Sequence, residues 1–178
     1  VELTLEEIRK YPEYEMEFVL VNDCSKDNTW KVLCSLAEKY SFVKTINLAK
    51  NFGQHNALMA AFHYAEGDLI VGMDDDMQTH PSQLPILLNK MKEGYDVVYG
   101  QYPYRKNSFI KNLTSKFNAY TSRILLGRPK TIVSSNYWVI NRMVRDEVIK
   151  STSYNPYVDA IFYRVTHNIA DVPIEHFK

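Results

Sequence analysis

The amino-acid sequence predicts an α/β fold, a mostly parallel sheet flanked by helices. Short apolar runs rich in strand-forming residues recur along the chain, and a helical pattern fills each interval between them. Strands that alternate with helices in this way pair in parallel, and the helices cover both faces of the sheet. With 178 residues, 46% of them hydrophobic, the chain can build one packed domain over residues 1–178 but not two ordinary ones.

The first hundred residues contain buried-strand runs separated by helical stretches. The chain opens in a helical pattern, Leu3–Ile8, with no strand before it, so we expect the first strand of the sheet to be missing and the chain to be a fragment. Ser82 is the expected cap of the helix that begins at Leu84. The predicted strands are Phe18–Val21, Val43–Leu48, Leu69–Met73 and Val97–Tyr99, and the predicted helices are Trp30–Tyr40, Asn56–Ala65 and Leu84–Met91.

After Gly100 the regular alternation of strands and helices changes. A polar, basic and aromatic stretch predicts a loop, and the helix that follows it ends at Gly127, close to Pro129. The last segment alternates as an edge strand does. The predicted elements are a loop over Gln101–Asn107, a helix over Phe109–Leu126, a strand over Tyr137–Ile140, a helix over Arg142–Lys150 and an edge strand over Ala170–Phe177.

The composition excludes several classes of protein. Lys+Arg and Asp+Glu both number 21, so no overall field favours nucleic acid, and phosphate binding must come from local groups. The two cysteines, Cys24 and Cys34, argue against a disulfide scaffold and suit a reducing compartment. The sequence has no run of about 18 apolar residues and no signal peptide, so we expect a cytoplasmic chain.

Polar residues follow each of the first predicted strands. In an open parallel sheet, ligands bind beyond the carboxyl ends of the strands, where these loops gather. Several polar loops on one rim therefore predict a binding site, which a single loop would not. The loops are Asn22–Asp27, Lys50–Gln54, Asp74–Gln78 and Gly100–Arg105.

An acidic triplet is the most informative of these features. In extended chain, alternate side chains point to the same side, so Asp74, Asp76 and Gln78 can converge while Asp75 turns away. Carboxylate and amide oxygens are hard ligands that suit Mg²⁺ or Mn²⁺. An isolated acidic triplet is more often a solvated turn, but the position of this one directly after a buried strand favours a metal site.

Other charged residues of the rim have two interpretations each. The Asp23 carboxylate can accept the imide hydrogen of a uracil ring, or it can cap the helix that begins near Asn28. Lys50 and Arg105 can neutralise phosphate charge or be ordinary surface charge. The position of Lys50 beside Asn51–Gly53 favours a role in binding for Lys50. His55 and His63 are expected in the core or on the surface.

Four segments of the chain carry a family resemblance. Together they resemble family 2 of the inverting nucleotide-sugar glycosyltransferases, which have the GT-A fold. Within that family they are most similar to the bacterial polyprenyl-phosphate glycosyltransferases and the dolichyl-phosphate mannose synthases. The segments are Val21–Trp30, Asn51–Leu58, Met73–Pro81 and Glu93–Gly100.

The resemblance implies a reaction and a set of site residues. It implies metal-dependent transfer, with Mg²⁺ or Mn²⁺, of a sugar from a nucleotide diphosphate sugar (a UDP-sugar) to polyprenyl phosphate. It also implies that the full-length protein works at the inner face of the cell membrane, held there by segments outside this chain, and an oligomer is compatible with it. The implied residues are Asp23, Ser25, Lys50, Asn51, Gly53, Asp74 and Asp75 for the nucleotide, Asp74, Asp76 and Gln78 for the metal, Asp76 and Arg105 for catalysis, and Arg105–Ser115 for the phosphates and the acceptor. Asp159 is a further catalytic candidate, as a general base.

The chain departs from the family pattern on the acceptor side. Asn136 and Trp138 stand where family members usually carry an acidic residue and an arginine. A phosphate acceptor is already anionic and needs no general base, whereas a hydroxyl acceptor does. The departure therefore favours a phosphate acceptor. Two alternatives remain: transfer to a hydroxyl of a growing cell-surface polysaccharide with Asp159 as base, and a non-catalytic domain that only binds a nucleotide-sugar.

Overall fold

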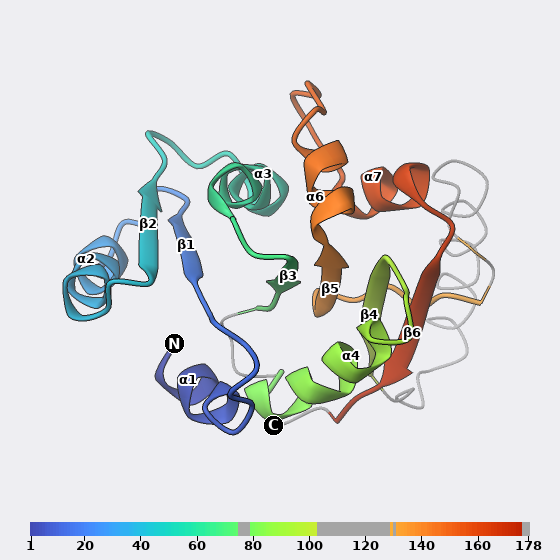
Figure 1. Cartoon of the computed structure of the whole chain (residues 1–178). Helices are drawn as coiled ribbons and strands as arrows, with labels where there is room; N and C mark the ends of the chain where they lie inside the picture. Colours follow the sequence, from blue (N-terminus) through green and yellow to red (C-terminus); the bar gives the residue numbers. More distant parts are fainter. Residues whose placement is uncertain (75–78, 103–128, 130, 176–178) are drawn as a thin grey trace, which may run out of the picture.

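The computed structural model describes residues 1–74, 79–102, 129 and 131–175. Strands and helices alternate through most of these residues, which confirms the predicted α/β class (Figure 1). The predicted helix Phe109–Leu126 lies outside the described residues. The strands are β1 (Phe18–Asn22), β2 (Val43–Asn47), β3 (Leu69–Gly72), β4 (Val97–Gln101), β5 (Trp138–Asn141) and β6 (Ile169–Pro173), and the helices are α1 (Glu2–Ile8), α2 (Thr29–Lys39), α3 (Gln54–Tyr64), the 3-10 turn η1 (Pro81–Gln83), α4 (Leu84–Met91), α6 (Arg142–Val148) and α7 (Val158–Val165).

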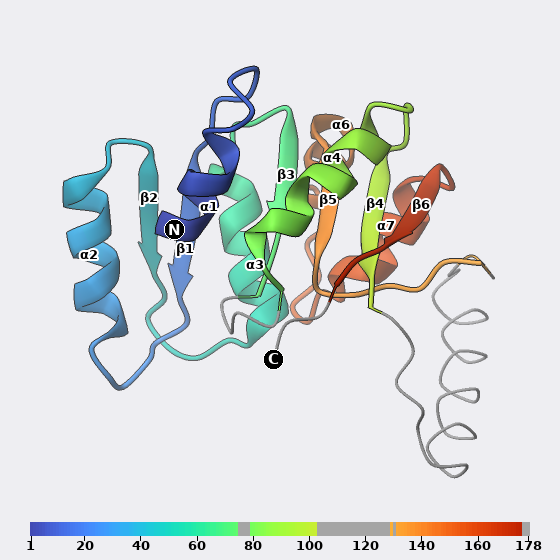
Figure 2. The same ribbon diagram turned by 90° about the horizontal axis from the view of Figure 1, so that it is seen from below.

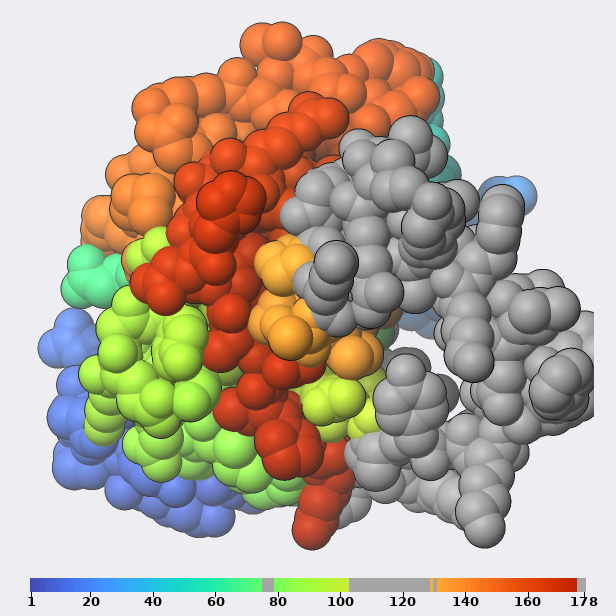
Figure 3. Space-filling model, turned by 90° about the vertical axis from the view of Figure 1, so that its right-hand side faces the viewer, coloured from blue at the N-terminus to red at the C-terminus, as the bar shows by residue number. Residues whose placement is uncertain are grey.

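The described strands form two sheets. β1 and β2 pair in parallel, and the other four strands pair in the order β3-β5-β4-β6. β4 and β6 are parallel, but β5 runs antiparallel to both β3 and β4. The apolar pattern predicted the β5 strand but not its direction, because a run buried on both faces is equally apolar in either direction. β6 lies at the edge of its sheet, as predicted, and the segment that contains it is visible on the face shown in Figure 3.

Helices cover both faces of the four-stranded sheet. α6 and α7 lie on one face and α4 on the other (Figure 1). Along β4, Val97 and Tyr99 belong to one apolar cluster and Val98 to the other, as the period of two in a strand requires. In the first cluster the indole of Trp138 packs against Phe62 and Phe162, with ring centroids 5.7 Å and 5.2 Å apart.

In the part of the chain that the structure describes, the two sheets lie side by side without a hydrogen-bonded ladder between them. Among the described residues, β1 pairs only with β2, and β3 pairs only with β5. Figures 1 and 2 place β1 and β3 next to each other in the row of strands. α3 contacts both β1 and β2 and also packs on α6 and α7, so it joins the two parts.

Glu17 is a second connection between the parts. It precedes β1, and its Oε1 accepts hydrogen bonds from the backbone N–H groups of Glu66 (2.5 Å) and Gly67 (2.9 Å), just before β3. Its Oε2 lies 2.9 Å from Nζ of Lys44 on β2. Burial acts to raise the pKa of Glu17, but Lys44 and the two backbone donors outweigh burial and leave this pKa below its ordinary value.

Glu17→Gln should therefore weaken the fold at neutral pH and reduce its sensitivity to acid. Because the folded-state pKa is lowered, the carboxylate stabilises the fold above the ordinary glutamate pKa, and this contribution is lost as pH falls through the lower folded-state value. We expect a loss of about 1–2 kcal/mol in the free energy of unfolding at pH 7, and a smaller difference at pH ~3. Urea unfolding of both proteins measures this; Glu13→Gln, at an exposed ion pair with Lys92, is the control. A constant difference at all pH values would contradict the prediction.

One predicted helix cap is wrong. Ser82 does not cap α4, which begins after Gln83 and follows the 3-10 turn η1. The cap of that turn is His80, whose Nδ1 accepts the backbone N–H of Ser82 at 3.2 Å. Pro81 occupies the first position of the turn, where its missing N–H costs nothing. The helical segment therefore starts at Pro81, earlier in the sequence than the predicted start at Leu84.

No helix in the described ranges is both long enough and apolar enough to cross a membrane.

Candidate functional site

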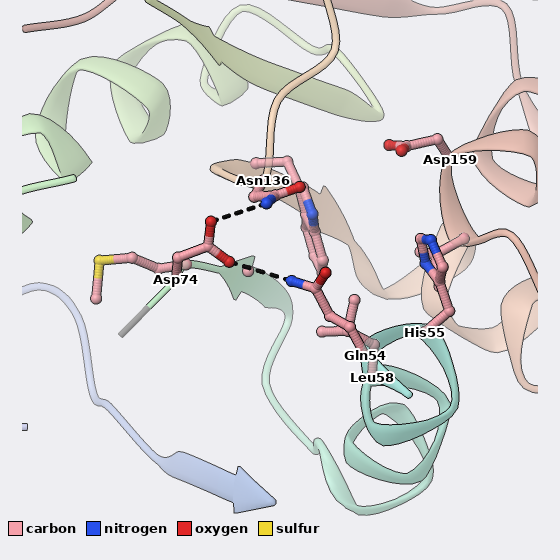
Figure 4. Close-up of a pocket in the computed structure, with 10 residues that line it drawn as sticks. Gln54, His55, Leu58, Asp74, Asn136 and Asp159 are labelled. Atoms are coloured by element: carbon pink, nitrogen blue, oxygen red, sulfur yellow. Dashed lines mark hydrogen bonds between the residues drawn. The ribbon is translucent and has the colours of Figure 1, made fainter. Parts of the chain in front are cut away.

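A small pocket opens where β3 ends and where α3 and α7 begin (Figure 4). It encloses about 60 Å³, far less than the several hundred Å³ usual for a bound ligand, so a nucleotide-sugar would extend beyond it over the rim. Its wall combines carboxylates and amides with an imidazole, above an apolar floor. The lining residues are Gln54, His55, Leu58, Gly72, Met73, Asp74, Asn136, Trp138, Val158 and Asp159.

Of the three predicted metal ligands, Asp74 is the one that lies within the described residues. It follows β3, and one side-chain amide donates to each of its two carboxylate oxygens (Figure 4). Nε2 of Gln54 lies 3.2 Å from Oδ1, and Nδ2 of Asn136 lies 2.8 Å from Oδ2. Each carboxylate oxygen can accept more than one hydrogen bond, so both retain lone pairs for an ion.

Asp23, directly after β1, fixes the loop that leads into α3. Its carboxylate accepts the backbone N–H groups of Phe52 at 2.7 Å and Gly53 at 2.8 Å. Gly53 has a φ of 86°, a left-handed conformation that glycine adopts without strain. The alternative of Asp23 as a helix cap is wrong: Asp27 instead accepts the N–H and hydroxyl of Thr29, in the first turn of α2.

These hydrogen bonds, together with the peptide bond between Gly53 and Gln54, form one network across the site. Asp23 holds the loop at Gly53, the next residue Gln54 holds Oδ1 of Asp74, and Asn136 holds Oδ2 of Asp74. This network joins the segments that follow β1 and β3 to the start of α3 and to the segment just before β5. It therefore brings together residues that the sequence could place only on a common rim.

Asp159 lies in the first turn of α7 and faces the same pocket (Figure 4). The hydroxyl of Tyr99, a fully buried residue, donates to its Oδ1 at 2.7 Å. Burial, followed by the negative charge of Asp159, raises the pKa of Tyr99 well above its ordinary value. Tyr99 therefore stays protonated and orients Asp159 as a hydrogen-bond donor.

The remaining predicted site residues divide into two groups. Ser25, Lys50 and Asn51 do not line the pocket; the Lys50 ammonium lies 4.8 Å from the ring centroid of Phe52, and the Ser25 N–H donates to Asn22. They are near Asp23 in the rim loops, and their roles stay predictions. The others lie outside the described residues: Asp75, Asp76, Gln78 and Arg105.

Several lining residues were not predicted. His55 belongs to the pocket wall, where its ring meets that of Tyr157 edge-on at 5.0 Å, whereas His63 is exposed as expected. α7 was also not predicted, although Val158, Ile161, Phe162 and Val165 have the i, i+3, i+4, i+7 spacing that signals a helix. That signal could have placed Asp159 in a first turn.

The described residues fit part of a divalent-metal site. Within the ranges that the structure covers, no cluster of three His, Cys, Asp or Glu residues could hold an ion. Asp74 supplies hard oxygen atoms, and its two contacts are neutral amides that do not compete with a cation for charge. The other two predicted ligands, Asp76 and Gln78, lie outside those ranges.

The chain is similar to a known protein family and to curated proteins. The family model "Glycosyl transferase family 2" matches residues 1–152. The chain is 36% identical over 136 residues to the undecaprenyl-phosphate 4-deoxy-4-formamido-L-arabinose transferase of Shewanella sediminis (strain HAW-EB3), covering 76% of this chain and 40% of that protein. It is 41% identical over 108 residues to the protein of the same name from Proteus mirabilis (strain HI4320), covering 60% and 33%. The chain thus spans less than half the length of these relatives.

A solved structure shows the same fold at low sequence identity. It is glucosyl-3-phosphoglycerate synthase from Mycobacterium tuberculosis in complex with Mn²⁺, uridine-diphosphate-glucose and phosphoglyceric acid. The two superpose with a TM-score of 0.59 at 17% identity, covering 99% of this chain and 68% of that chain. This likeness confirms the predicted GT-A fold.

Proposed function

The chain belongs to glycosyl transferase family 2, and we propose that it transfers a sugar from a UDP-sugar to polyprenyl phosphate, with inversion and with Mg²⁺ or Mn²⁺ as cofactor. The names of the two curated relatives support the lipid phosphate as acceptor. The Mn²⁺ and UDP-glucose in the complex of the structural neighbour support the donor and the metal.

The observation that carries the proposal is the position of Asp74. Its carboxylate ends a strand of the sheet, lies in the pocket, and is joined by hydrogen bonds through Gln54 to the loop that Asp23 holds. A donor whose base lies at Asp23 would have its phosphates along this loop and its sugar over the pocket. We assign the nucleotide to Asp23, Ser25, Lys50, Asn51, Gly53, Asp74 and Asp75, and the metal to Asp74, Asp76 and Gln78.

The reaction is a single displacement at the anomeric carbon. An oxygen of the acceptor phosphate forms the new bond as the bond to the UDP oxygen breaks, and the electron pair of that bond leaves with UDP. A divalent ion, when bound, would supply stabilisation of the charge that develops on the departing diphosphate. Asp74 and Asp76 would hold that ion, and Arg105 would add positive charge. Asp159 lies across the pocket from Asp74 (Figure 4).

Calorimetry and a transfer assay test the proposal. UDP should bind this chain more tightly with Mn²⁺ than without it. Full-length protein incubated with labelled UDP-sugar should label polyprenyl phosphate and not an oligosaccharide. Binding of UDP without any transfer would indicate a non-catalytic binding domain instead.

A second candidate acceptor, a saccharide hydroxyl, has one observation in its favour. Asp159 is in the pocket and is oriented by Tyr99, as a general base would need to be. An anionic phosphate needs no such base, and the amide of Asn136 presents no carboxylate in its place.

Asp159→Asn separates the two acceptors. With polyprenyl phosphate we expect kcat to fall less than about tenfold, because no proton has to be removed; loss of a general base would lower kcat roughly 100-fold or more. The kcat of the full-length variant should be measured with both acceptors. A loss of the larger size with polyprenyl phosphate would contradict the phosphate-acceptor assignment.

The location of the reaction follows from the acceptor. Polyprenyl phosphate is a membrane lipid, and UDP-sugars and reduced cysteines such as Cys24 and Cys34 belong to the cytoplasm. We therefore place the reaction at the inner face of the cell membrane, with contact to the lipid made by segments outside this chain.

A further inference from the structure

We propose that Gln54 and Asn136 form an amide clamp, a pair of positioning residues that orient Asp74 and, because they are uncharged, set how tightly it binds a divalent cation. This inference rests on the proposed function, since it concerns the proposed metal ligand. It assigns to Asn136 a role other than that of the acidic residue expected at its position.

The clamp acts on both carboxylate oxygens at once. Gln54 donates to Oδ1 and Asn136 to Oδ2, and the two donors come from segments far apart in the chain (Figure 4). A carboxylate held at both oxygens loses the rotational freedom that an exposed aspartate otherwise has. The binding of an ion then does not have to offset the entropy of fixing that side chain.

Both donors are themselves anchored to rigid elements. Gln54 is the first residue of α3, and the preceding Gly53 is bound to Asp23. On the other side, the hydroxyl of Ser135 accepts the N–H of Tyr137 at 3.1 Å and donates to its carbonyl at 3.0 Å, and the Tyr137 side chain is fully buried. Asn136 lies between these two residues, so its backbone has little freedom to move away from Asp74.

The neutrality of the clamp matters as much as its geometry. An aspartate at position 136 could not donate, and it would place a second negative charge about 3 Å from Oδ2 of Asp74. Without an ion the two carboxylates would repel each other, and a divalent ion between them would remove this repulsion. The amide therefore keeps Asp74 oriented without an ion, and it keeps the affinity for the ion lower than a carboxylate would.

The clamp predicts opposite effects for two variants of one residue. Asn136→Ala should raise the Kd for Mn²⁺, measured with UDP present, roughly tenfold, the lower end of the range for residues that orient metal ligands. Asn136→Asp should lower that Kd several-fold, and Gln54→Ala should act like Asn136→Ala. Calorimetry and the Mn²⁺ electron paramagnetic resonance signal both measure the affinity, with no need for turnover. Asn89→Asp, an exposed position on α4 outside the pocket, is the control for the added charge.

Two results have different meanings. If wild type shows Mn²⁺-dependent UDP binding but Asn136→Ala and Asn136→Asp both match it, or both weaken it equally, the clamp is refuted and the proposed function stands. If wild type binds UDP no better with Mn²⁺ than without, the proposed function itself fails. Asn136 is exposed, and Asn136→Asp preserves its shape, so a folded protein is available for the comparison.

Discussion

Asp74→Ala is expected to abolish the Mn²⁺-dependent gain in UDP affinity, a loss of roughly 100-fold or more. The variant removes both oxygens that the clamp residues Gln54 and Asn136 hold in the pocket. It also leaves the amides of Gln54 and Asn136 without the acceptor that they share. Loss of a ligand would cost several kcal/mol, because the proposed ion would contact both the protein and the diphosphate, and each ~1.4 kcal/mol is a factor of ten in affinity.

Calorimetry of UDP binding with and without Mn²⁺ measures this loss. Asp68→Asn is a matched control, because Asp68 lies at the opposite end of β3 and its side chain is 93% exposed. UDP binding without metal should be similar in all three proteins, since the Asp23 loop is unchanged. Metal-dependent binding that survived in Asp74→Ala would remove the basis of the proposed function.

Gly72→Ala should destabilise the fold by about 3 kcal/mol, the upper end of the usual cost of overpacking. Gly72 pairs with Trp138 across β3 and β5, and a Cβ at this position would lie 2.2 Å from Cζ2 of the indole. The indole has no room to withdraw, because Phe62 and Phe162 pack against it. A cost of this size is a large fraction of the 5–15 kcal/mol that stabilises an ordinary domain.

Urea unfolding of four proteins tests the clash between Gly72 and Trp138. The wild type, Gly72→Ala, Trp138→Leu and the double variant form a cycle that isolates the interaction between the two positions. The smaller leucine makes room for the added methyl group, so Gly72→Ala should cost much less in the Trp138→Leu background. Equal costs in both backgrounds would show that the indole is not the obstacle.

Local pattern was sufficient to predict most of the elements near their observed positions. The run Leu69–Met73 and the helical face of Trp30–Tyr40 predicted β3 and α2 because burial imposes a period of two or 3.6 on a sequence. The direction of β5 was not predictable in this way. It depends on which strands it lies between, and that is decided by packing over distances that no local window covers.

The positions of single residues of the candidate site were predictable, but the contacts between them were not. Asp74 followed from its position after a buried strand, and Asp23 from the same reasoning at β1. The contact of Asp74 with Asn136 joins positions 62 apart in sequence, and the contact of Asp74 with Gln54 joins positions 20 apart. Amides have no pattern that signals a partner at such a distance, so the clamp could be found only from the structure.

The separation between β1 and β3 makes the two parts of the chain unequal in strength. Between residues 18 and 47 only Asn22 and Val43 are buried, whereas nearly all residues of β4 and β5 are buried. Local opening begins where few apolar contacts are lost, so the part with β1, β2 and α2 is the one that opens first. That part also carries Asp23, the proposed contact to the nucleotide base. Capture of the proposed donor would then tighten the weaker of these two described parts, and part of the binding energy would be consumed in ordering it.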